Sequence, residues 1–176
     1  LGESRLLSLD DQSEQRILCN LFYETTMDEV LRAHPWNFAI HRWSLNKLTE
    51  TPITEDYEYY FQLPNDPHCL RVLDIPDTPT ADYRVEGRRI ITSLNAVTIR
   101  GIRRVVNTEE FDPLFVIALA YKLATNLAVP LTKSKQKINE LMGMYHLQEQ
   151  QAAGTNDIEG LGPIEGNHDW KTAGRS

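Results

Sequence analysis

Histidine and cysteine are the side chains that most often bind metals or act as bases and nucleophiles, and this sequence has few of either. No histidine pair has the HExxH spacing, which would place two ligands on one helical face. Cys19 and Cys69 lie far apart without a CxxC motif, so they cannot make a tetrahedral zinc site by themselves. We therefore expect no metal site. The histidines are His34, His41, His68, His146 and His168.

Other catalytic patterns are also missing from the sequence, which favours a protein that is not an enzyme. No serine lies in a nucleophile elbow, and Cys19 falls in an apolar helical stretch where a thiolate would be costly. Gly160, Gly162 and Gly166 miss the dinucleotide-binding spacing by one position, so we expect no cofactor. Four acids in the β-rich region are most simply solvated surface charges, with a carboxylate-pair glycan hydrolase as an alternative. They are Asp56, Glu58, Asp74 and Asp77.

The basic cluster of the sequence consists of five arginines in the β-rich region. Charges on an exposed strand face discourage edge-to-edge pairing, and this is the simpler interpretation. The alternative is a surface that binds an acidic partner. A helical regulator that binds nucleic acid through these arginines is the main rival function, but the net charge of −7 disfavours phosphate binding. The candidate interface residues are Arg88, Arg89, Arg100, Arg103 and Arg104.

The bulk composition suits one domain with a tail. A chain of 176 residues with 41% hydrophobic residues can build one core. No apolar run approaches the roughly 18 residues of a membrane helix, and the start lacks a signal-peptide pattern, so we expect no membrane partner. The sequence opens on Leu1 rather than methionine, so we expect further residues upstream.

Three helices are predicted, over about residues 11–34, 113–129 and 132–153. In the first, Asp11 and Glu14 resemble a capping box, and the residue before Pro35 is pushed out of the helical region. The second begins at Asp112-Pro113 and is apolar on most faces, which predicts complete burial. Pro130 is expected to end it. The third is amphipathic, with Thr132 as its expected N-cap and Gly154 as its expected C-cap.

Between about residues 57 and 106 the hydrophobic period becomes that of strands, so the fold class is α+β: mainly a helical bundle with an antiparallel β region. Short β-branched and aromatic segments alternate with Pro, Asp, Asn and Gly. Glu86-Gly87 predicts a tight turn, and Gly101 predicts a bulge because it interrupts the alternation. The predicted strands are Tyr57–Phe61, Leu70–Ile75, Tyr83–Glu86, Arg89–Thr92 and Val97–Val106.

From residue 155 onward the sequence becomes rich in glycine and acids, with isolated apolar residues. Such a segment cannot bury a core of its own. We therefore divide the chain into a domain at 1–154 and an extended C-terminal arm at 155–176 that lies against another protein. Its candidate anchors are Ile158, Leu161, Ile164 and Trp170.

Two aromatic residues follow the first helix in alternation after a proline. Trp36 and Phe38 can therefore both turn into the core where helix and sheet meet, with direct contact to a partner as the alternative. Leu119 and Leu123, in the apolar second helix, are further core candidates.

Several motifs occur in an order and spacing that together are more specific than any one of them. The sequence over about residues 1–153 resembles the tail tubular protein A family, also called tail adaptors or head-to-tail connectors, of short-tailed bacteriophages. Leu1-Gly2 and the Ser8–Asp11 turn resemble the end of the family's first helix and the junction that follows it. The other motifs are residues 34–39 with Arg42, then 59–66, 70–73, 83–90, 97–100, 111–115 and 118–124.

The resemblance implies a mechanical role in the virion. The family forms rings of twelve copies at the head-tail interface, between the portal protein and the tail nozzle protein, around the channel through which the genome passes. It implies no catalytic residue. A negatively charged subunit fits this role, because a channel wall that lacks phosphate-binding cations lets DNA slide without specific binding.

Overall fold

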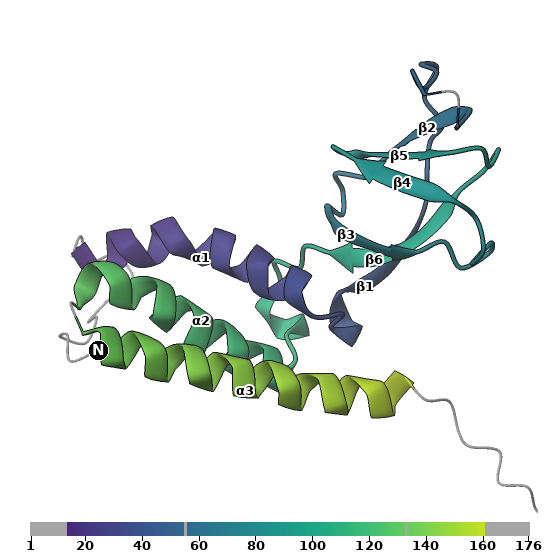
Figure 1. Cartoon of the computed structure of the whole chain (residues 1–176). Coiled ribbons are helices and arrows are strands. Elements are labelled where there is room, and N and C mark those ends of the chain that lie inside the picture. The colour runs from purple at the N-terminus through teal and green to yellow at the C-terminus, as the bar shows by residue number, and fades with distance from the viewer. Residues whose placement is uncertain (1–13, 55, 133, 161–176) are drawn as a thin grey trace, which may run out of the picture.

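The structure is a computed structural model that describes residues 14–54, 56–132 and 134–160. These residues form a mixed α+β fold in which the helices lie side by side and the strands form a separate unit beyond the end of α1 (Figure 1). The helices are α1 (Glu14–Ala33), α2 (Pro113–Leu131) and α3 (Lys135–Gly160), with short 3-10 helices at Asn37–Ala39 and Thr108–Glu110. The strands are β1 (Ile40–Ser44), β2 (Tyr59–Gln62), β3 (Cys69–Asp74), β4 (Tyr83–Glu86), β5 (Arg89–Thr92) and β6 (Thr98–Arg103).

The strands form two antiparallel sheets of three, ordered β1-β6-β3 and β2-β5-β4. Apolar side chains of both sheets meet in one cluster, while Leu70 and Ile102 of the first sheet join the core of the helices. The β1-β6-β3 sheet is therefore a shared layer with an apolar core on each face. The cluster between the sheets contains Trp43, Phe61, Leu63, Cys69, Ile75, Ile90, Val97 and Ile99.

Strand β1 was not predicted. Its apolar residues, Ile40 and Trp43, do not alternate in the sequence because they serve the two different cores: Ile40 packs against the helical cluster and Trp43 belongs to the cluster between the sheets. The β region therefore begins at residue 40 rather than at about 57.

The junction between α1 and β1 is held by Trp36. Its side chain is 1% exposed, and its Nε1 donates a hydrogen bond to the carbonyl oxygen of Val30 at 3.0 Å. The ring centroids of Trp36 and Phe38 lie 5.3 and 5.1 Å from that of Phe115 in α2. Phe38 is partly buried against the helical core, so the two alternating aromatics connect α1, α2 and the first sheet.

Glycine is required at two positions of the β region, for different structural reasons. Gly87 lies in the turn between β4 and β5 with a positive φ of 59°, which glycine adopts without steric cost. Gly101, in the central strand β6, is required by a close approach, because a Cβ there would lie 2.5 Å from the carbonyl oxygen of Arg71. The irregularities lie in the neighbouring strand β3 rather than at Gly101 itself, because the pairing register with β6 shifts between Cys69 and Arg71 and again between Val72 and Asp74.

Helix α2 begins as predicted, with the Asp112 side chain accepting a hydrogen bond from the amide of Leu114 at 2.7 Å. Its predicted end at Pro130 is wrong, since the helix continues to Leu131. A proline this close to the end removes only one of the last helical hydrogen bonds. The amide of Thr132 then donates to the carbonyl of Ala128 at 2.9 Å and closes the last turn.

The expected complete burial of α2 is also wrong. α2 contacts α1 on one side and α3 on another, so part of its surface stays open. Leu119 is buried and Leu123 is half-buried, whereas Val129 is 66% exposed. By length and composition α2 is apolar enough to span a membrane, contrary to the expectation from the sequence, but a core helix packed between two others passes the same test.

Helix α3 begins later and ends later than predicted. Ser134, rather than Thr132, accepts a hydrogen bond from the amide of Lys137 at the N-terminus. The helix passes through Gly154 to Gly160, so residues 155–160, with Ile158, are helical and not an extended arm. Gly154 lacks the positive φ of a C-cap, and glycine inside a helix costs only about 1 kcal/mol. The anchors Leu161, Ile164 and Trp170 lie outside the described residues, as does the Ser8–Asp11 turn.

Candidate functional site

The five arginines proposed from the sequence do not form a single unpaired basic surface. Four of them make ion pairs with acids of the same chain. Three of these pairs connect segments that are far apart in the sequence, and the fourth joins the end of β6 to the 3-10 helix that follows it, with the charged groups partly exposed. The pairs are Arg89–Glu50, Arg100–Asp74, Arg103–Glu110 and Arg104–Asp28.

The pair of Arg104 and Asp28 joins the end of the β6 segment to α1. Both ends of the guanidinium donate to the carboxylate, with Nε to Oδ1 at 2.8 Å. The hydrogen bond that Arg104 donates to Asp28 raises the pKa of the Arg104 side chain above its ordinary value. Partly exposed pairs of this kind contribute about 0–1 kcal/mol to stability, so the pair chiefly sets the orientation of the sheet against α1.

Arg88 differs from the other four because it has no carboxylate partner among the described residues. Its guanidinium donates to the carbonyl oxygens of Cys69 at 2.7 Å and Pro64 at 2.6 Å, and to Asn65 Oδ1 at 3.2 Å. It also lies 3.2 Å from His68 Nε2. Burial lowers the pKa of His68, and the positive charges of Arg88 and Arg104 lower it further.

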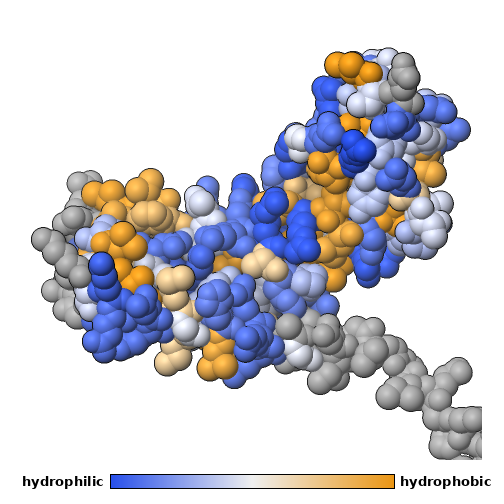
Figure 2. Space-filling model, viewed as in Figure 1, coloured by the Kyte–Doolittle hydropathy of each residue, from blue (hydrophilic) through white to orange (hydrophobic). Residues whose placement is uncertain are grey.

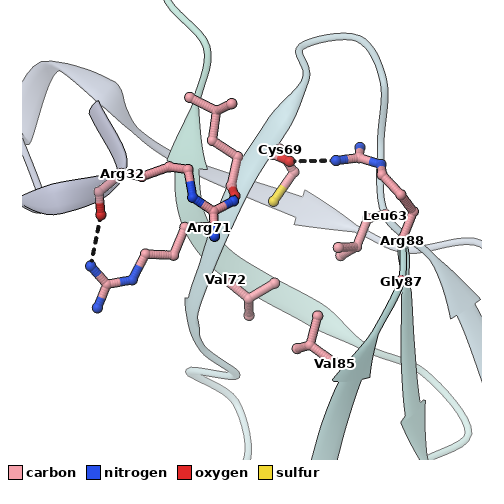
Figure 3. A pocket seen from close by; sticks show the side chains of 9 residues that line it. Arg32, Leu63, Cys69, Arg71, Val72, Val85, Gly87 and Arg88 are labelled. Atoms are coloured by element: carbon pink, nitrogen blue, oxygen red, sulfur yellow. Dashed lines mark hydrogen bonds between the residues drawn. The ribbon is translucent and has the colours of Figure 1, made fainter. Parts of the chain in front are cut away.

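Arg88 is one wall of a pocket of about 450 Å³ between the end of α1, strand β3 and the β4–β5 turn (Figure 3). Arg32 and Arg71 line the side next to α1, with the Arg71 guanidinium turned toward the Arg32 carbonyl and away from Arg88 (Figure 3). Arg71 Nη1 donates to the carbonyl oxygen of Arg32 at 3.0 Å, and Arg32 Nη1 donates to the carbonyl oxygen of Leu70. This pocket could not be predicted from the sequence, because its arginines come from three distant segments. The remaining lining residues are Leu63, Cys69, Leu70, Val72, Val85 and Gly87.

The helices carry a second unusual surface made of exposed aliphatic side chains. On α1, Ile17 is 61% and Leu21 is 66% exposed. Val129 of α2 lies at the same end of the helical layer, because α1 and α2 run antiparallel. Hydrophobic residues gather on this end of the molecule in Figure 2. The antiparallel order is fixed by the contacts Asn126–Thr26 at 2.9 Å and Lys122–Glu29 at 2.7 Å.

A matching pair lies on α3, where Met144 and Leu147, three residues apart on one helical face, are each 49% exposed. α1 and α3 each pack against α2 and lie on either side of it, so the two sets of exposed side chains belong to the two outer helices (Figure 1). Clustered exposed aliphatic side chains mark interaction surfaces more often than scattered ones do.

The alternatives that involve chemistry gain no support from the described residues. Asp74, one of the four acids considered for a hydrolase, is paired with Arg100, and Asp56, Glu58 and Asp77 are exposed. Burial raises the pKa of the Cys69 thiol. Within the described ranges, no three His, Cys, Asp or Glu side chains are grouped so that they could hold a metal.

Comparison with known proteins does not assign this chain to a family. Neither the protein-family models nor the curated proteins match this chain. Its function must therefore be inferred from its motifs and from the two surfaces described above.

Proposed function

We propose that this chain is a structural virion protein, a head-to-tail adaptor of a short-tailed bacteriophage. Twelve copies form a ring between the portal protein and the tail nozzle protein and line the genome channel. The order of the motifs supports the proposal through its resemblance to the tail tubular protein A family. The structural observation that carries it is the pair of exposed aliphatic rows on α1 and α3.

A ring needs two different contact surfaces on every subunit, because the front of one copy meets the back of the next. The row with Ile17 and Leu21 and the row with Met144 and Leu147 lie on different helices on either side of α2. Side-by-side copies would bury one row against the other. Each aliphatic side chain that becomes fully buried contributes about 1.5–3 kcal/mol, before the cost of association.

In this proposal the helices form a bundle that packs between copies, and the β unit is carried on it as an insertion. Residues 161–176 extend from α3 as an arm. The net charge of −7 disfavours phosphate binding, and four of the arginines are paired with acids of the same chain, which suits a wall along which DNA must move.

Mass photometry of the chain, alone and with the portal protein of its phage, tests the proposal. We expect monomers or small oligomers alone and closed rings with the portal, because weak contacts cooperate once a template fixes their geometry. Leu21→Asp should reduce ring formation about tenfold, since the carboxylate must be desolvated in the contact.

Ile53→Asp is the matched control, because Ile53 is 98% exposed and lies in a loop outside the helices. It should assemble like the unmodified chain. Stable rings at high dilution without the portal would contradict the templating step. Equal assembly of the two variants would contradict the helical interface.

A further inference from the structure

The pocket between α1, β3 and the β4–β5 turn combines two properties. Arg32, Arg71 and Arg88 line it, and none of them has a carboxylate partner within the described parts of the chain. This contrasts with Arg89, Arg100, Arg103 and Arg104, which are all paired with acids. Three uncompensated positive charges in one pocket of a chain with a net charge of −7 indicate a site for an anionic ligand.

The three guanidinium groups are held in place by backbone carbonyl oxygens. Arg71 donates to the carbonyl of Arg32, Arg32 to that of Leu70, and Arg88 to those of Cys69 and Pro64. A guanidinium has five N–H donors, so Arg32 and Arg71 keep most of theirs for a ligand. The groups are therefore positioned before a ligand arrives, which lowers the entropy cost of binding.

The other residues that line the pocket are mainly aliphatic, and they favour an anionic ligand that also carries an apolar group. Leu63, Leu70, Val72 and Val85 are aliphatic, and Val85 is 47% exposed. A free phosphate would leave these side chains uncovered. A peptide segment that carries a carboxylate next to an aliphatic side chain would satisfy the cations and cover the aliphatic wall together.

This chain contains such a segment after α3. Within residues 161–176, Ile164 is followed directly by Glu165, and Asp169 is followed directly by Trp170. The segment can span up to about 50 Å when extended, at roughly 3.3 Å per residue. We propose that the pocket binds residues 161–176 of a second copy of this chain, with the Glu165 carboxylate on the arginines and Ile164 against the aliphatic wall.

The inference that a second copy supplies this segment to the pocket rests on the proposed ring. α1 and α3 run in the same direction, since each is antiparallel to α2, and they lie on different sides of it. Gly160 and the pocket beside Arg32 are therefore at the same end of the helical layer but on different flanks. When α3 of one copy packs against α1 of the next, the end of α3 comes close to the neighbouring pocket.

Photo-crosslinking in the full chain tests this contact. Benzoylphenylalanine replaces Ile164, equal amounts of 14N and 15N protein are mixed with the portal, and crosslinked peptides are identified by mass spectrometry. We expect crosslinks from position 164 to β3 or β4 peptides that join light to heavy copies. Arg71→Glu should reduce them about tenfold through charge repulsion, and adding Glu165→Arg should restore them.

Arg42→Glu is the matched control, because Arg42 is an exposed arginine on the same sheet and outside the pocket. It should leave the crosslink yield unchanged, and thermal melting should verify that all variants fold. Crosslinks confined to single copies, or insensitive to Arg71→Glu, would overturn the proposal. Rings that form without crosslinks to the pocket would overturn the proposed pocket contact but would remain consistent with the adaptor function. Intermolecular pocket crosslinks without any ring would support the contact and count against the adaptor function.

Discussion

The two buried tryptophans of the described fold give the sharpest test of how the junction is held. Trp36 is 1% exposed and its Nε1 donates to the carbonyl oxygen of Val30 at 3.0 Å. That carbonyl lies in the last turn of α1. Trp43 is 7% exposed, but its buried Nε1 has no hydrogen-bond partner among the described residues.

Replacing each tryptophan by phenylalanine removes a similar ring volume and the same N–H group. Trp36→Phe loses a hydrogen bond with a net worth of about 0.5–1.5 kcal/mol and leaves the Val30 carbonyl buried without it. Trp43→Phe instead removes an unsatisfied donor, whose burial costs about 1–3 kcal/mol. The loss in free energy of unfolding should therefore be larger for Trp36→Phe by at least about 1.5 kcal/mol.

Urea denaturation followed by far-ultraviolet circular dichroism measures both losses without relying on tryptophan fluorescence. An unchanged slope against urea is required for each variant, because a changed slope means a changed unfolding reaction. Trp36→Ala gives the upper limit, with an expected loss of about 3–5 kcal/mol. Equal losses for the two phenylalanine variants would refute the reasoning that the Val30 hydrogen bond distinguishes them.

Three further predictions concern the sheets and the charge. Gly101→Ala should lower the free energy of unfolding by about 1–3 kcal/mol in urea denaturation, because its Cβ would meet the Arg71 carbonyl oxygen at 2.5 Å. Stability should fall as pH drops below about 6.5, because the lowered pKa of His68 lets the unfolded chain take the proton first; pH-dependent melting should show less of this fall for His68→Gln. Duplex DNA should bind no tighter than about 10⁻⁴ M at physiological salt, whereas submicromolar binding with a steep salt dependence would favour a nucleic-acid regulator.

The elements that follow one hydrophobic period could be predicted from the sequence. β4 and β5 match the predicted ranges, because a tight turn separates two short β-rich segments, and Gly87 has the positive φ that such a turn requires. β1 could not be predicted in this way, since Ile40 and Trp43 face different cores and leave no simple alternation. A strand with an apolar core on each face does not show the alternation of apolar and polar residues by which strands are predicted.

A single proline or glycine predicted the end of a helix less reliably than the hydrophobic pattern predicted the helix itself. Pro130 and Gly154 were each expected to end a helix, yet each is inside one. The free-energy cost of one such residue is small beside the packing of a long helix, as for α3, where Tyr145 and Ala152 are buried in the helical core. Where an element ends therefore depends on tertiary contacts that the local sequence does not contain.

The arginines show a further limit of sequence reasoning. Adjacent positions made Arg88, Arg89 and the β6 arginines look like one basic cluster, but a charge is available to a partner only if no acid of the fold compensates it. Asp28 reaches Arg104 across 76 residues of sequence, and no local pattern predicts that pairing. Arg32 and Arg71, which are separated in the sequence from each other and from Arg88, instead share a pocket with it and lack a carboxylate partner in the described parts of the chain. A group of arginines without such compensation thus lies where three separate segments meet.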